Sequence, residues 1–142
     1  MIDEVIILDK MSEMQGYLEE IEPYLTKSIS DIAHEKSILR SVERLFQLIV
    51  DTALAINAHI IAEKNLPIPS DYQSTFITLA QSKIFPMEFA YKIAPSVGLR
   101  NLIIHKYGEV NLMRMIEDIK ADIADYYGYL DHIDSFLKNL SE

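Results

Sequence analysis

The stretch from Leu39 to Ala62 reads LRSVERLFQLIVDTALAINAHIIA and decides the fold of this chain. Its apolar side chains recur at alternating steps of three and four residues, which places them on one face of an α-helix. These positions are Leu39, Val42, Phe46, Ile49, Ala53, Ile56 and Ile60. Such a seam packs against neighbouring helices at crossing angles of about 20°. We therefore predict a long helix over residues 32–64.

Two further long helices are predicted near the ends of the chain. The first covers residues 3–26, with a stripe formed by Val5, Leu8, Met11, Met14, Leu18, Ile21 and Leu25. The last covers residues 112–140 and begins after Asn111, whose side chain suits a helix N-cap. Its stripe is Leu112, Ile116, Ile119, Ile123, Tyr126, Leu130, Ile133, Leu137 and Leu140.

Prolines divide the middle of the chain, at positions 67, 69, 86 and 95. The first pair denies a helix its backbone donors and predicts a loop over residues 65–69. Ser70 and Gln73 then form a capping-box pattern that starts a short helix. Pro86 would open another segment, which Pro95 should bend or break. The segment that follows Pro95 is predicted to end at Gly108, as a left-handed C-cap.

Scarce glycine and proline favour an all-α chain, and long helices with short connections predict an antiparallel bundle of four to five helices in one domain, residues 1–142. The chain has no cysteine, which excludes disulfides, thiolate zinc sites and cysteine nucleophiles, and fits a cytoplasmic location. The amino terminus lacks the basic region of a signal peptide. The apolar stretch 46–62 contains Asp51, Asn57 and His59, so we interpret it as a buried bundle helix and expect no membrane span.

The most informative motif for function is RNLIIHKY at residues 100–107. Arg100 carries the guanidinium group that is best shaped to grip a phosphate, and His105 carries an imidazole, the natural proton carrier near pH 7. Residues 65–107 contain four basic and two acidic side chains, whereas the whole chain has a formal net charge of −9. An acidic chain of this kind is not a generic nucleic-acid binder, but the motif lies in its one locally cationic segment.

In a regular helix Arg100 and His105 would point in directions that differ by about 140°, with Cα atoms about 7.5 Å apart. One solution is an irregular helix start near Pro95 and Gly98. The other is a second subunit that brings its own motif across a twofold axis, which we prefer because twofold dimers are the commonest oligomers. Two arginines and two histidines would then line one cleft suited to a polyanionic strand.

The pattern Arg100, Asn101, His105 and Tyr107 resembles the Arg-x4-His-x-Tyr signature of the HEPN superfamily, specifically the HepT toxins of HepT–MntA toxin–antitoxin pairs. The chain length and the position of the motif before the last helix are also similar, so the resemblance covers essentially the whole chain. It implies a homodimeric helical bundle that acts as a metal-independent endoribonuclease. It also implies a minimal nucleotidyltransferase antitoxin, MntA-like, that neutralises the toxin by transferring AMP to Tyr107.

The chemistry expected from these residues requires no metal or cofactor. His105 would act as general base on a ribose 2′-hydroxyl or as general acid on the leaving oxygen. Arg100 would hold the scissile phosphate, and Asn101 would orient the imidazole or the phosphate. Tyr107 would carry the AMP group, whose bulk and charge block RNA. Lys106 is a candidate for a contact with the RNA backbone, although we prefer its interpretation as a solvated lysine.

Other candidate sites are weaker. His34, within the sequence Asp31-Ile-Ala-His34, imitates half of a di-iron motif, but no Glu-x-x-His pair completes it, so we expect no metal. No phosphate-binding loop, nucleophile elbow or glycine-rich dinucleotide turn is present in the sequence. The alternative to a ribonuclease is a HEPN-like scaffold or binding module that partners a nucleotidyltransferase without cutting RNA.

Overall fold

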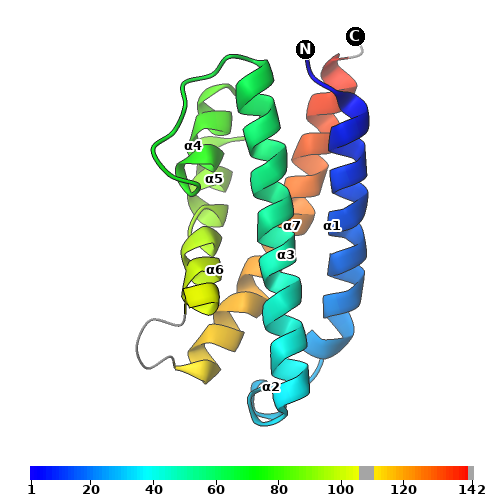
Figure 1. The fold of residues 1–142 in the computed structure, drawn as a ribbon, viewed down its shortest axis with the longest axis vertical. Helices are drawn as coiled ribbons and strands as arrows, with labels where there is room; N and C mark the ends of the chain where they lie inside the picture. Colours follow the sequence, from blue (N-terminus) through cyan, green and yellow to red (C-terminus); the bar gives the residue numbers. More distant parts are fainter. Residues whose placement is uncertain (106–110, 141–142) are drawn as a thin grey trace.

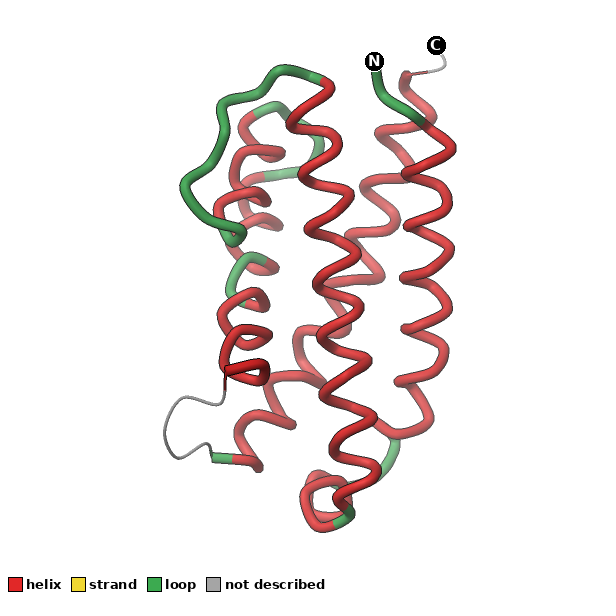
Figure 2. The backbone as a smooth tube through the Cα atoms, viewed as in Figure 1, coloured by secondary structure: helices red, strands yellow, loops and turns green. Residues whose placement is uncertain are grey.

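The computed structural model describes residues 1–105 and 111–140, and this part of the chain is helical apart from its connecting loops (Figures 1 and 2). The helices are α1 (Glu4–Leu25), α2 (Ile29–His34), α3 (Lys36–Glu63), α4 (Ser74–Gln81), α5 (Met87–Ile93), α6 (Ser96–His105) and α7 (Leu112–Leu140). The prediction of an all-α fold is confirmed. Seven helices are described instead of four to five, because α2 is separate from α3 and the chain between α3 and α7 is divided into three short helices.

The helices form four antiparallel columns (Figure 1). Helices α1, α3 and α7 each form one column, and the fourth consists of α6 together with α4 and α5, which pack side by side. The chain runs down α1 and up α3, descends in the loop of residues 65–73, passes up α4 and down through α5 and α6, and runs up α7 (Figures 1 and 2). This arrangement is the expected antiparallel bundle, with a broken column in place of one long helix.

Helix α3 is the central element, and the apolar face predicted for it is confirmed as buried. All seven positions of the predicted seam belong to the core: Leu39, Val42, Phe46, Ile49, Ala53, Ile56 and Ile60. The helix is long and apolar enough to cross a membrane by length and composition, but 61 % of its most apolar window is buried inside the bundle. Burial against other helices accounts for this hydropathy.

The predicted single helix over residues 32–64 is wrong at its start. Residues Ile29–His34 form the separate helix α2, and Glu35 adopts an extended conformation with φ −103° and ψ 101°. Ser28 caps α2 by accepting a hydrogen bond from the Asp31 backbone N–H at 3.0 Å. Ile32 is fully buried, and α2 packs against α7. No proline or glycine lies between residues 29 and 36. We therefore attribute the change of direction between α2 and α3 to the burial of Ile32.

Two local predictions near the helix starts also need correction. Val5 and Leu8 were expected on the buried stripe of α1, but they are 66 % and 51 % exposed, and Ile7 is buried instead. The capping box at Ser70 and Gln73 does not form. Helix α4 begins at Ser74, whose backbone N–H donates to the Asp71 carboxylate at 2.8 Å. The Asp71 side chain, one residue after Ser70, provides the acceptor instead.

The remaining boundaries agree with the sequence. Pro86 directly precedes α5 and Pro95 separates α5 from α6, so both act as helix breakers. Asn111 caps α7 by accepting a hydrogen bond from the Arg114 backbone N–H at 3.1 Å. The predicted C-cap at Gly108 lies outside the described residues.

Buried hydrogen bonds fix the α4–α6 column against the rest of the bundle. Ser96, at the start of α6, shares a 2.6 Å hydrogen bond with the hydroxyl of Tyr126 in α7. The hydroxyl of Tyr129 donates to the Asn57 side chain in α3 at 2.6 Å, and the same amide donates to Thr75 in α4 at 3.0 Å. These groups are buried, so they specify how α6 is oriented on α7 and how α4 is oriented on α3.

Candidate active site

Arg100 lies in the middle of α6 and is oriented by a carboxylate of α3. One oxygen of Asp51, Oδ1, accepts a hydrogen bond from Arg100 Nε at 2.8 Å and forms an ion pair with Arg100 Nη2 at 2.6 Å. The Arg100 side chain is 18 % exposed and that of Asp51 is 36 % exposed. A charge-assisted contact of this kind at a half-buried position restricts the guanidinium group to one orientation.

Asn101 and Tyr72 complete the surroundings of the guanidinium group. Arg100 Nη1 donates to Asn101 Oδ1 at 2.7 Å, and the Arg100 Cζ atom lies 6.0 Å from the centre of the Tyr72 ring. Within the described part of the chain, the hydrogen bonds to Asp51 and Asn101 use two of the five N–H groups of the guanidinium, and Nη2 forms an ion pair with Asp51. N–H groups on both Nη1 and Nη2 can therefore donate to a phosphate oxygen.

Asp51 and Tyr72 were not identified as site residues from the sequence. Asp51 was noted there only as a charge in an apolar helix, which argued against a membrane span. A carboxylate in the middle of an apolar helix needs a partner, and Arg100 is that partner. This requirement was the signal in the sequence that could have identified Asp51 as a site residue. The position of Tyr72 depends on the path of the loop before α4, which no local pattern specifies.

His105 is the last described residue of α6 and is exposed. Arg100 is five residues before it in the same helix, so the two side chains leave α6 in directions about 140° apart. Helix α6 begins at Ser96, and an irregular start at Arg100 is therefore not the way in which the two residues converge. Lys106 and Tyr107 lie outside the described residues.

Acidic side chains partly neutralise the positive charge that was expected for residues 65–107. Arg100 is paired with Asp51, and Lys92 lies 3.3 Å from the buried carboxylate of Asp125 in α7. One turn away, burial raises the pKa of Asp122 to about 7, with further contributions from Asp125 and Asp118. The cationic segment of the sequence is therefore partly neutralised where it faces α3 and α7.

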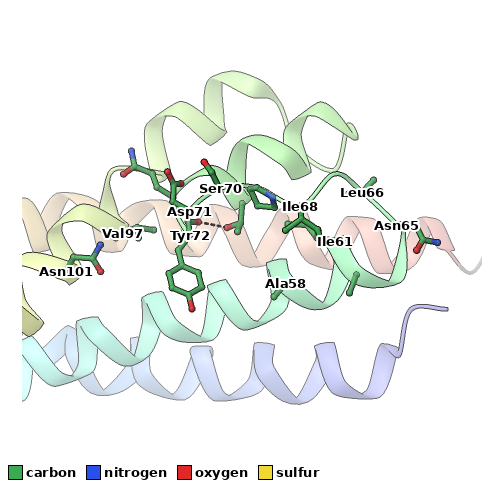
Figure 3. A pocket seen from close by; sticks show the side chains of 14 residues that line it. Ala58, Ile61, Asn65, Leu66, Ile68, Ser70, Asp71, Tyr72, Val97 and Asn101 are labelled. Carbon is green, nitrogen blue, oxygen red and sulfur yellow. Dashed lines mark hydrogen bonds between the residues drawn. The ribbon is translucent and has the colours of Figure 1, made fainter.

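A pocket of about 850 Å³ adjoins the site on the side of Asn101 (Figure 3). One wall is the exposed face of α3 at Ala58 and Ala62, and the opposite wall is the loop of residues 65–73. Val97 and Asn101 of α6 close the end of the pocket. Asn101 thus borders both the guanidinium group and the pocket.

The described residues contain no group of three or more His, Asp or Glu side chains that could hold a metal ion. Nδ1 of His34 lies 2.7 Å from the Ser30 carbonyl oxygen, which accepts a hydrogen bond from it within the same helix. His59 accepts a hydrogen bond from the Asp3 backbone N–H at 3.1 Å, which joins α3 to the residue before α1.

Comparison with known proteins gives a consistent result. A family model described as "Ribonuclease HepT-like" matches residues 14–133. The tRNA nuclease HepT of Aphanizomenon flos-aquae is 30 % identical over 141 residues, which is 99 % of this chain and 96 % of that protein. The mRNA nuclease HepT of Shewanella oneidensis is 24 % identical and is matched over 90 % of this chain and 96 % of its own length.

Solved structures show the same fold. The chain is similar to the tri-AMPylated Shewanella oneidensis HEPN toxin in complex with an MNT antitoxin, with a TM-score of 0.83 and 24 % identity. The match covers 92 % of this chain and 97 % of that chain. The cytosolic protein YutE of Bacillus subtilis has a TM-score of 0.70, with 15 % identity over 90 % of both chains. From the family match and the 30 % identical relative, the chain belongs to the ribonuclease HepT-like family.

Proposed function

We propose that this protein is a metal-independent endoribonuclease and the toxin of a toxin–antitoxin pair. The observation that carries the proposal is the guanidinium group of Arg100, which Asp51 and Asn101 hold in one orientation. The exposed His105 lies at the end of the same helix. Family membership supports the ribonuclease class, and these two side chains can supply the chemistry that cleavage of RNA requires.

In the proposed mechanism, His105 removes the proton from a ribose 2′-hydroxyl, which attacks the adjacent phosphorus. Arg100 binds the phosphate oxygens and stabilises the negative charge that accumulates on them. Asn101 positions the guanidinium group through its carbonyl oxygen, and Asp51 does so from the opposite edge. The bond to the 5′-oxygen breaks, an acid protonates this oxygen, and the products carry a 2′,3′-cyclic phosphate and a 5′-hydroxyl.

The divergence of Arg100 and His105 supports a site built by two subunits. Two copies of α6 placed across a twofold axis would bring the arginine of one copy to the histidine of the other, and the two histidines could divide the acid and base roles. Mixing of variants tests this arrangement. A mixture of Arg100→Ala and His105→Ala subunits would regain cleavage if each site draws on both subunits. Two inactive variants that stay inactive when mixed would place the site within one chain.

The partner that we propose is an MntA-like nucleotidyltransferase acting in the cytoplasm. A HEPN toxin of the same fold is tri-AMPylated and bound to an MNT antitoxin, and Tyr107 of the present chain is the proposed acceptor of AMP. Incubation of both proteins with ATP, followed by mass spectrometry, would detect one or more added AMP groups. Persistence of the full mass increase in Tyr107→Phe would exclude this tyrosine as the acceptor.

Cleavage of RNA in the presence of EDTA is the principal experiment. We expect the native protein to cut RNA, and His105→Ala to cut about 100- to 10,000-fold more slowly, the usual contribution of general acid–base catalysis. Arg100→Ala should be similarly impaired. Lack of cleavage by the native protein would instead support the scaffold alternative, and unchanged cleavage by both variants would refute the assigned roles.

A further inference from the structure

The pocket beside Asn101 has a lining that is unusual for a phosphate-binding surface. Its walls are largely apolar, from Ala58, Ile61 and Val97, and its polar lining residues are mainly amides and hydroxyls. No lysine or arginine is among the described residues that line it. Among these residues the carboxylate is that of Asp71, which accepts hydrogen bonds from Ser74 that hold its pKa below the usual value. A neutral, flat ligand with hydrogen-bonding edges fits this lining better than a phosphate does.

An aromatic side chain stands between this pocket and the guanidinium group. Tyr72 lines the pocket and is 63 % exposed, and its ring centre lies 6.0 Å from Arg100 Cζ. Figure 3 shows the Tyr72 side chain extending from the loop toward α3, between Asn101 on one side and Ala58 on the other. Bases of single-stranded RNA stack on exposed aromatic rings of this kind.

Asn101 supplies a polar group at the same boundary. Its carbonyl oxygen accepts from Arg100, so the N–H groups of the amide are directed to other acceptors. Asn101 also lines the pocket. A base in the pocket would therefore meet an amide donor from the residue that holds the phosphate-binding arginine. The proposed phosphate site and the pocket share Asn101 and Tyr72 at their border, and this shared border favours one RNA strand as the occupant of both.

We propose that the pocket formed by α3, the loop of residues 65–73 and Asn101 binds the RNA nucleobase next to the cleaved phosphodiester, with Tyr72 as its stacking surface. This proposal rests on the proposed ribonuclease function and assigns to the pocket a role in choosing the cleavage position. A base that stacks well and presents an acceptor to Asn101 would favour cleavage at the adjacent bond.

Short RNA oligonucleotides with a single ribose at the cleavage position provide the test. Each flanking nucleotide in turn is replaced by an abasic one. At one of these positions the native protein should lose about 5- to 150-fold in kcat/KM, the range that corresponds to the stacking of one base. The variant Tyr72→Ala should show little further loss with the abasic substrate. The matched control is Tyr91→Ala, which removes an equally exposed tyrosine, 66 %, from α5.

A second variant fills the pocket without changing the stacking residue. Ala58→Leu adds a larger side chain on an exposed position of α3 that lines the pocket. It should reduce cleavage of the intact substrate and spare the abasic one, whereas Ala121→Leu, at an exposed position of α7, should affect neither. Equal rates for intact and abasic substrates at every flanking position would overturn the proposal. So would equal losses on both substrates in Tyr72→Ala and Ala58→Leu.

Binding measurements separate failure of the pocket from failure of the ribonuclease proposal. The same oligonucleotides with a 2′-deoxyribose at the cleavage position are followed by fluorescence anisotropy. If the native protein cuts no RNA but binds the intact strand more tightly than the abasic one, and Tyr72→Ala removes this difference, the pocket is supported and the nuclease is not. Equal affinity for the intact and abasic strands would overturn the pocket as a base-binding site.

Discussion

Removal of the Asp51 carboxylate should disable the arginine that it holds. In Asp51→Ala, Arg100 loses the hydrogen bond from Nε at 2.8 Å and the ion-pair contact of Nη2 at 2.6 Å, and keeps the hydrogen bond to Asn101. The guanidinium group can then rotate about its long side chain. Asp51 is a positioning residue in this account, because it contacts the arginine and not the phosphate. Its removal should lower kcat/KM about 10- to 100-fold, the cost of a misplaced group that stabilises charge.

The partial burial of the pair sets the expected loss of stability. A fully exposed ion pair contributes about 0–1 kcal/mol, and breaking a fully buried one costs about 3–5 kcal/mol. The two side chains here are 18 % and 36 % exposed. We therefore expect Asp51→Ala to lower the free energy of unfolding by about 1.5–3 kcal/mol, the value for hydrogen bonds to charged groups.

A double-mutant cycle with Arg100→Ala measures the coupling between the two side chains. Urea unfolding and RNA cleavage are compared for the native protein, both single variants and the double variant. The loss of activity caused by Asp51→Ala should disappear when Arg100 is already alanine. The control Asp134→Ala breaks the exposed pair with Lys138 and should change stability by less than about 0.5 kcal/mol. Additive effects of the two substitutions at positions 51 and 100 would refute the positioning role.

Two further predictions concern stability. Tyr129→Phe removes the buried donor to Asn57 and should lower the free energy of unfolding by about 1–3 kcal/mol in urea; an unchanged midpoint would contradict the buried hydrogen bond. Asp122 has a pKa of about 7, raised mainly by burial, so the folded state binds its proton more tightly than the unfolded state and loses stability as pH rises from about 4 through 7. Asp122→Asn should therefore be stabilising at pH 8 and nearly neutral at pH 4, and a pH-independent difference would show that Asp122 does not titrate in this range.

The long-range features of the fold were accessible from the sequence because they depend on periodic burial. The seam of α3 predicted its buried face, and α7 was bounded correctly by its cap at Asn111. The break at Glu35 was missed because no local signal marks it; it results from the burial of Ile32 against other helices. Similarly, the first turns of α1 carry apolar side chains on several faces, so periodicity could not select Ile7 over Val5.

Only part of the site could be predicted from the sequence, because tertiary packing brings the rest of it together. Arg100, Asn101 and His105 are close in sequence, and residue chemistry identifies them as candidates. Asp51 is 49 residues away from Arg100, and only the packing of α6 on α3 brings the two together. The roles of the motif residues stay predictions, and those of Lys106 and Tyr107 concern residues outside the described part of the chain.

Chemical rescue of His105→Ala tests the proposed proton transfer most directly. His105 is exposed at the end of α6, so free imidazole can reach the space that its ring vacates. The account predicts that RNA cleavage by this variant, measured in EDTA, rises in proportion to added imidazole and yields 2′,3′-cyclic phosphate ends. Cleavage by His105→Ala at the native rate without imidazole would contradict it.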